Sequence, residues 1–253
     1  MKLKVMTYNI AGGRDYTSPE KKKPFHPEAC ASVIRKVSPD ICGLNEVDYK
    51  LPRSGRLKLA EVIGNMLGYE SRFAPAVTWG PGTYGNGFLS RHPIVEFEIF
   101  PIQDPQDKSE PVYYEPRVIL HAAVDFSGSV VDVYVSHFGL AKTEEESAVK
   151  TLVGILQEAK RPVILMGDFN VTPDNPVLSP IRELLTDSFD VYPNKDASTI
   201  FTYPSTPEAA SNPETKLKID YIFVSRDIRV DSVEILETQE SDHKPYIAYI
   251  ELP

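Results

Sequence analysis

The feature that most constrains this chain is a series of short apolar runs that recur along its whole length. Runs of this length, with period-two alternation and many Val, Ile, Tyr and Phe residues, predict β-strands rather than helices. Polar, Pro-containing or Gly-containing stretches separate most of them, as expected for turns. The predicted strands cover residues 3–10, 40–47, 69–75, 85–90, 94–102, 117–126, 130–138, 162–170, 218–225 and 246–252.

Three segments between the predicted strands have helical spacing instead. Apolar residues recur on one face within 26–40, 57–68 and 144–159. Pro39 ends the first of these patterns, and Gly68 is placed as the C-cap of the second. Many strands with a few helices between them predict two packed sheets with helices outside, an α/β sandwich. The chain has no internal repeat or linker-like stretch, so we expect residues 1–253 to form a single domain.

The composition argues against several classes of protein. Hydrophobic residues make up 42% of the chain and charged residues 25%, which is ordinary for a globular protein. No apolar run approaches the ~20 residues of a membrane helix, and the N-terminus alternates like a strand rather than like a signal peptide. We therefore expect a cytoplasmic monomer. Cys30 and Cys42 lack metal-type spacing. The net charge of −9 argues against binding long nucleic acid mainly through its phosphates.

Several predicted strands end in a polar residue on the face that was apolar up to that point. A single Asn or Asp at a strand end is usually a turn residue, and a single His is usually a satisfied side chain. Here five strands end in this way, and Asp242 and His243 directly precede a sixth strand. Together they predict one oxygen-rich pocket at one edge of a two-sheet sandwich. The strand-end residues are Asn9, Glu46, His137, Asp168 with Asn170, and Asp220.

The types of residue in this predicted pocket indicate its chemistry. Carboxylate and amide oxygens, without cysteine and with few histidines, suit a hard cation such as Mg²⁺ or Mn²⁺. A His beside one Asp, with a second Asp to orient its ring, is a general-base arrangement. The combination predicts metal-assisted attack of water on a phosphoryl centre.

The same residues carry a resemblance to a known family. In order along the chain, TYNI, GLNEVD, GFLSR, VSHF, GDFN, IDYIFVS and SDHKP resemble the motifs of the endonuclease/exonuclease/phosphatase superfamily, whose members include DNase I-like nucleases. The stretches EVDYKLPRSGR and GTYGNGFLSR, followed by EPR, resemble a small bacterial branch of it. The resemblance spans almost the whole chain. It implies a four-layered α/β sandwich, in which two mixed sheets pack face to face.

The resemblance also implies roles for individual residues. Glu46 is implied as the principal Mg²⁺ or Mn²⁺ ligand, with Asn9 and Asp242 close to the same or a second ion. His243 is implied as the general base, oriented by Asp220.

Three further residues have implied roles around the phosphate. Asp168 and Asn170 would position the attacking water and a phosphate oxygen, and His137 would hydrogen-bond the phosphate in the transition state. Asn45 stands where the family most often has Gln. Because alternation puts Asn45 on the opposite face from Glu46, we expect this departure to have little effect.

The substrate is less constrained than the reaction. Arg117 and Asn86 are candidate substrate contacts, although a surface ion pair and a turn position explain them equally well. We expect a phosphodiesterase, or a phosphatase, that acts on a phosphorylated small molecule or lipid headgroup. The alternative is a DNA or RNA nuclease with the same site. A non-catalytic binding protein is disfavoured, because each residue that such a protein would have lost is present.

Overall fold

The computed structural model describes residues 1–191 and 200–253, and its strands form two six-stranded mixed sheets. The first sheet has the order β11 (Arg229–Ile235), β12 (Tyr246–Glu251), β1 (Lys2–Asn9), β2 (Ile41–Tyr49), β4 (Gly82–Ser90) and β3 (Glu70–Trp79). The second has the order β5 (Ile94–Pro101), β6 (Val118–Phe126), β7 (Ser129–His137), β8 (Val163–Asp168), β10 (Asp220–Val224) and β9 (Thr186–Asp187). Strand β1 is parallel to β2, and β7 is parallel to β8.

The two sheets pack face to face, and alternate residues of the central strands fill the space between them. Val131, Val133 and Val135 of β7 belong to the same buried cluster as Leu3 and Val5 of β1. This is the apolar face that the period-two alternation predicted for both strands.

The sheets pack tightly together at a glycine of the first sheet. A Cβ atom on Gly43 of β2 would lie 2.6 Å from the sulfur of Met166 in β8. This glycine therefore allows the central strands of the two sheets to come together just below the strand ends that carry the polar residues.

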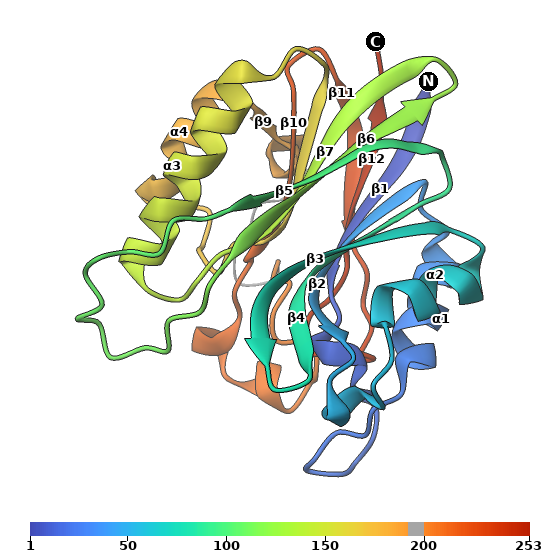
Figure 1. Ribbon diagram of the computed structural model, residues 1–253, viewed down its shortest axis with the longest axis vertical. Helices are drawn as coiled ribbons and strands as arrows, with labels where there is room; N and C mark the ends of the chain where they lie inside the picture. Colours follow the sequence, from blue (N-terminus) through green and yellow to red (C-terminus); the bar gives the residue numbers. More distant parts are fainter. Residues whose placement is uncertain (192–199) are drawn as a thin grey trace.

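Helices cover the outer faces of both sheets (Figure 1). Helices α1 (Pro27–Val37) and α2 (Leu59–Leu67) lie on the first sheet, where Ile34 and Ile63 pack with Leu44 of β2. Helices α3 (Lys142–Glu158) and α4 (Ser179–Leu184) lie on the second, where Leu152 packs with Leu165 of β8. Short 3₁₀ turns η1 to η6 cover Ala11–Gly13, Pro52–Ser54, Pro176–Leu178, Ser188–Val191, Ala209–Ser211 and Pro213–Thr215.

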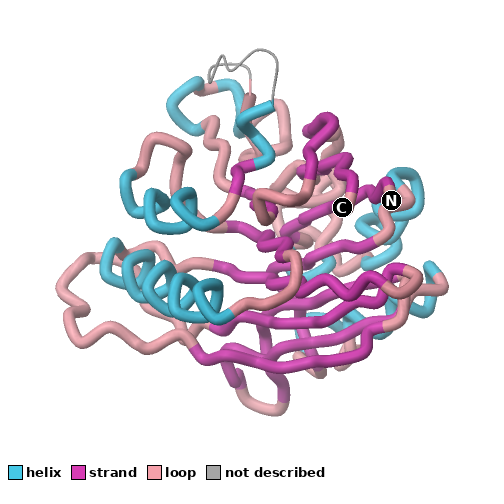
Figure 2. Tube along the Cα trace, turned by 90° about the horizontal axis from the view of Figure 1, so that it is seen from above, coloured by secondary structure: helices cyan, strands magenta, loops and turns pink. Residues whose placement is uncertain are grey.

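The result is the helix–sheet–sheet–helix sandwich that the sequence predicted, and the layers are visible from above (Figure 2). The sequence missed α4 and two strands, β9 and β11. Strand β9 has only two residues. In β11 the pairing register shifts between Val230 and Ser232, so its inward residues Val230, Val233 and Ile235 do not alternate. In the part of the chain that the structure describes, no helix combines the length and the apolar character needed to cross a membrane.

Candidate active site

The polar strand ends meet in one pocket of about 470 Å³ at the edge of the sandwich. The carboxyl ends of β1 and β2 lie side by side in one sheet, and those of β7 and β8 lie side by side in the other. Seven of the residues predicted from the sequence line this pocket, namely Glu46, Arg117, His137, Asp168, Asn170, Asp242 and His243. Asn9 and Asp220 contact lining residues from behind, whereas Asn86 lies elsewhere.

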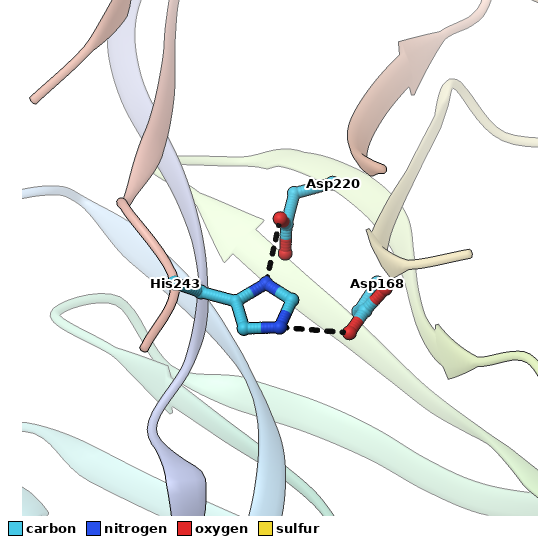
Figure 3. Close-up of side chains that lie close together, drawn as sticks. All are labelled: Asp168, Asp220 and His243. Atoms are coloured by element: carbon cyan, nitrogen blue, oxygen red, sulfur yellow. Dashed lines mark hydrogen bonds and ion pairs between the residues drawn. The ribbon is translucent and has the colours of Figure 1, made fainter. Parts of the chain in front are cut away.

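His243 lies between two buried carboxylates (Figure 3). Its Nδ1 is 2.9 Å from Oδ2 of Asp220 and therefore donates to it, because a carboxylate can only accept. Its Nε2 is 3.5 Å from Oδ2 of Asp168. Burial opposes a charge on this ring, but the two carboxylates outweigh it and raise the pKa of His243 to about 10. Burial also disfavours the charged form of Asp168, and in a carboxyl group this raises the pKa.

The loop that carries His243 is attached to the first sheet. Ser241 is fully buried and its hydroxyl donates to the backbone carbonyl of Asn9 (2.7 Å). The backbone N–H of Ser205 donates to the carbonyl of Asp242 (2.7 Å), and the ring of Tyr203 tilts against the imidazole with centroids 4.9 Å apart. These contacts fix the position of the imidazole before any substrate arrives.

His137 lies on the opposite wall with a different set of neighbours. Nη1 of Arg117 is 2.9 Å from its Nδ1, and Arg117 also pairs with Glu115 (3.1 Å). Because a guanidinium only donates, Nδ1 of His137 accepts and Nε2 carries the proton. Burial and the positive charge of Arg117 hold the pKa of His137 well below its usual range, so this ring is neutral.

A second donor lies beside Nε2 of His137. Nδ2 of Asn170 is 3.2 Å away and uses one of its hydrogens on the backbone carbonyl of Phe138 (3.0 Å). With Nε2 protonated, two N–H groups are side by side at the pocket wall, and Oδ2 of Asp168 lies 3.6 Å from Nε2. A single acceptor, such as a phosphate oxygen, would satisfy both of them.

Glu46 and Asp242 form an acidic end of the pocket. The amide of Asn9 donates to Glu46 (3.1 Å) and to Asp168 (3.0 Å), so it bridges the two sheets. Burial, and next the negative charge of Asp242, raise the pKa of Glu46. Two carboxylates that repel each other, with a neutral amide as the hydrogen-bond partner of Glu46, are a donor set that fits a divalent cation.

Asp168, Asp220 and His243 also place three ligand-type atoms within 4.8 Å of one another. The His243 ring already bonds Asp220, and its proton-bearing form would repel a cation at this point. The acidic end formed by Glu46 and Asp242 therefore fits a metal better than this cluster does.

Glu46 reaches the pocket through an irregularity in β2. Leu44 pairs with Gly87 and Val47 with Gly85, so Asn45 and Glu46 together lie opposite one residue of β4. The φ of Glu46 is 58°, an uncommon value for a residue with a side chain. Strict alternation would have directed Glu46 to the face of Leu44, under the helices. The bulge directs it to the pocket instead.

Asn45 was expected to have little effect, yet its buried side chain has hydrogen-bond partners in both sheets. Its Oδ1 accepts from the backbone N–H of Asp168 (2.9 Å), and its Nδ2 donates to the carbonyl of Ser136 (3.0 Å) and to Oδ1 of Asn86 (2.9 Å). It is fully buried and ties β2 to β7 and β8 directly below the carboxylate of Asp168.

Asn86 does not line the pocket. It accepts from Asn45 and donates to the carbonyl of Val118 (2.9 Å), so its amide joins the two sheets. Its burial and these partners support a structural role, and we assign it no contact with substrate.

Several pocket residues had no signal in the sequence. Tyr84, Tyr113, Leu140 and Tyr203 line the pocket, and Tyr16 from the loop after β1 lies against Asp242. Burial and the Asp242 carboxylate raise the pKa of Tyr16. Apart from Tyr84, which lies on β4, these are loop residues that follow no periodic pattern, so only the folded path of the chain brings them together.

A larger open groove of about 680 Å³ lies between α3 and the outer face of β5, β6 and β7. Four of its polar side chains are paired with one another. His121 bonds Asp132 (2.8 Å), and Arg161 bonds both Asp132 (3.0 Å) and Glu96 (2.7 Å). The groove lacks the converging donors and acceptors of the strand-end pocket, so the chemistry belongs to the smaller site.

Comparison with known proteins agrees with this fold. Residues 6–243 match the model of the Endonuclease/Exonuclease/phosphatase family. Over 139 residues the chain is 29% identical to protein cwh43 of Schizosaccharomyces pombe, which covers 53% of this chain but only 13% of that protein.

Two solved structures illustrate the likeness. An endonuclease/exonuclease/phosphatase from Beutenbergia cavernae has a TM-score of 0.80 and 25% identity, over 99% of this chain and 72% of that one. The Bacteroides thetaiotaomicron mannosyl-6-phosphatase Bt3783 has a TM-score of 0.73 over 99% of this chain and 100% of its own, and at 18% identity it shows the fold alone. The chain belongs to the endonuclease/exonuclease/phosphatase family.

Proposed function

We propose that this protein is a divalent-metal-dependent phosphodiesterase that hydrolyses a phosphoester of a small molecule or a lipid headgroup. The observation that carries the proposal is the pocket itself, where a proton-accepting cluster, a pair of phosphate donors and an acidic cation site face one another. Its size of about 470 Å³ suits a small substrate.

Water is activated by the His243–Asp220 pair together with Asp168. The family resemblance implied His243 as the general base; because the ring holds its proton between two carboxylates, we assign the proton acceptor to the Asp168 carboxylate beside it instead. Burial raises the pKa of Asp168, which makes it a better proton acceptor than an ordinary carboxylate. Asp220 orients the ring, and the charged ring attracts the anionic substrate.

The phosphate is held on the opposite wall. The adjacent N–H groups of His137 and Asn170 donate to one phosphate oxygen, and Arg117 keeps His137 in the tautomer that donates from Nε2. Donors fixed in advance contribute most where negative charge develops in the transition state.

Glu46 and Asp242 would hold the cation, and Asn9 positions Glu46 through its amide. A divalent cation at this end supplies positive charge that offsets the charge developing on the phosphate. Mg²⁺ and Mn²⁺ both accept oxygen ligands of this kind.

A diester is favoured over a monoester by the charge of the wall. Among the described lining residues, Arg117 and the two imidazoles face four acidic side chains, Glu46, Glu115, Asp168 and Asp242. A monoester carries almost twice the charge of a diester at neutral pH, so it would need more positive neighbours than this wall provides.

The alternatives are a phosphomonoesterase, the activity in the name of the Bacteroides neighbour, and a nuclease. Parallel assays with a chromogenic diester, a chromogenic monoester and supercoiled plasmid, each with Mg²⁺, Mn²⁺ or EDTA, test all three. We expect metal-dependent hydrolysis of the diester without plasmid nicking. Nicking that disappears in His243→Ala would favour the nuclease instead, and faster hydrolysis of the monoester would favour the phosphomonoesterase.

A further inference from the structure

The charged centre of the pocket is surrounded by apolar and aromatic side chains. Six lining residues are of this kind, namely Tyr84, Tyr113, Leu140, Tyr203, Leu217 and Ile219. Tyr113 is 67% exposed and Leu140 is 55% exposed. Large apolar side chains that remain exposed beside a pocket of charged groups indicate a binding surface.

The two exposed side chains are displayed by loops that one buried carboxylate holds in place. Glu144, in the first turn of α3, is 4% exposed. Its Oε1 accepts from the backbone N–H of Glu115 (3.0 Å), close to Tyr113, and its Oε2 accepts from the backbone N–H of Ala141 (3.2 Å), next to Leu140. The exposure of both side chains is therefore built into the fold.

Gly139, the residue before Leu140, packs directly against the side chain of Glu144. A Cβ atom on Gly139 would lie 2.2 Å from the carboxyl carbon of Glu144. In the other loop, the carbonyl of Asp107 accepts from the hydroxyl of Thr143 (3.1 Å), which joins that loop to α3 as well. A surface fixed in advance binds an apolar group without a further loss of loop entropy.

The wall that carries His243 has apolar character too. Tyr203 and Leu217 are joined by two backbone hydrogen bonds (3.0 and 2.7 Å), and both line the pocket. The Tyr203 ring tilts against the imidazole of His243. An apolar surface thus continues directly from the groups that handle the phosphate.

We infer that the substrate is a phosphodiester with an alkyl or aromatic group a few atoms from phosphorus, and that Tyr113 and Leu140 bind this group. The inference rests on the proposed function, because it assumes that the phosphate is held by His137 and Asn170. The apolar group would cover surface that water now covers. Each methylene that is fully buried in this way increases affinity by about fourfold.

The test compares methyl, hexyl and phenyl esters of p-nitrophenyl phosphate with Mn²⁺. All three release the same p-nitrophenolate, so differences in kcat/KM report on the other group. We expect the hexyl or the phenyl ester to exceed the methyl ester by at least about tenfold, a factor that the full burial of two methylenes would already give. The hexyl and phenyl arms distinguish a lipid-like group from an aromatic one. Equal values for all three esters would overturn the inference while leaving the phosphodiesterase proposal intact.

Variants locate the effect on the surface. In Leu140→Ser and Tyr113→Ser the preference over the methyl ester should fall to about twofold. Val95→Ser is the matched control, because Val95 is 52% exposed on β5 and does not line the pocket. A fall of the same size in Val95→Ser would contradict the assignment.

A binding measurement covers the case in which none of the esters is hydrolysed, which would count against the proposed function. Methyl hexylphosphonate and methyl methylphosphonate are monoanions in which the P–C bond resists hydrolysis and the ester bond has methoxide, a poor leaving group. Calorimetry in the presence of Mn²⁺ should give about tenfold tighter binding of the hexyl compound to the wild type, and less in Leu140→Ser. Equal or weaker binding of the hexyl compound would overturn the inference whatever the assays show.

Discussion

At the scale of single residues, the site depends on which groups lie next to its two histidines. His243 is charged because Asp220 and Asp168 lie on either side of its ring, at 2.9 and 3.5 Å. His137 is neutral because burial and Arg117 oppose its charge. Two histidines of one pocket are thus held in opposite protonation states by their neighbours, which gives each a different task.

The charge of His243 predicts a dependence of stability on pH. Its pKa is raised to about 10 in the folded protein, against about 6.5 in an unfolded chain. This stabilisation is fully present below pH 6.5 and is lost as the pH rises towards 10. In EDTA, we expect the free energy of unfolding to fall by at least about 1.4 kcal/mol between pH 7 and pH 10, the equivalent of one pKa unit.

In His243→Gln, this part of the dependence of the free energy of unfolding on pH should be lost, because glutamine does not titrate. Denaturant titrations of both proteins at several pH values measure it. If the two stability curves ran parallel between pH 7 and pH 10, the charged form of His243 would not be stabilised by its carboxylate neighbours.

The position of Glu46 at the acidic end of the pocket predicts where a divalent metal ion binds. Glu46→Gln removes a negative charge from the acidic end but keeps the size of the side chain. We expect Mn²⁺ to raise the Tm of the wild type by mass action and Glu46→Gln to need at least about tenfold more Mn²⁺ for the same shift. Glu61→Gln on the exposed side of α2 is the control. An unchanged Mn²⁺ requirement in Glu46→Gln would place the ion elsewhere.

At the scale of elements, the bulge in β2 is what turns a strand end into a site. It gives Glu46 its φ of 58° and turns that side chain to the pocket, while Asn45 keeps the face of Ile41 and Gly43 towards the second sheet. Neighbouring residues of one strand thereby serve opposite purposes, since Glu46 faces the pocket and Asn45 holds Asp168 from behind. Sequence alternation alone cannot show this, because a bulge shifts the face of every residue after it.

Asn45→Ala tests the connection between the sheets. The substitution leaves the buried N–H of Asp168 and the side-chain oxygen of Asn86 without this partner, so we expect a loss of about 2–4 kcal/mol in the free energy of unfolding. The loss of activity should exceed the loss of folded protein, because Asp168 moves. Asn65→Ala, on an exposed position of α2, is the control. Wild-type stability in Asn45→Ala would contradict this account of the connection between the sheets.

At the scale of the whole molecule, the sequence predicted the two sheets, the covering helices and the shared end at which the polar residues gather. Strands such as β7 keep strict alternation up to His137. The sequence alone therefore indicates both the face of each side chain and the residue at which the strand ends. The pairing of His243 with Asp220 joins the loop before β12 to the first residue of β10, and the ordered motifs of the family implied it. The approach of Tyr16, Tyr113 and Leu140 depends on loop paths, which no periodic pattern encodes.

The most direct test of the account is the Mn²⁺-dependent kcat/KM of a chromogenic phosphodiester for the wild type, Asp220→Asn and Glu61→Gln. The Asp220 side chain hydrogen-bonds the ring of His243 and does not line the pocket, so its substitution disturbs the orientation of that ring and weakens its charge without removing a lining group. We predict metal-dependent hydrolysis by the wild type and Glu61→Gln, and a loss of about 10²-fold or more in Asp220→Asn. Equal activity of Asp220→Asn and the wild type would contradict the assignment of the active site.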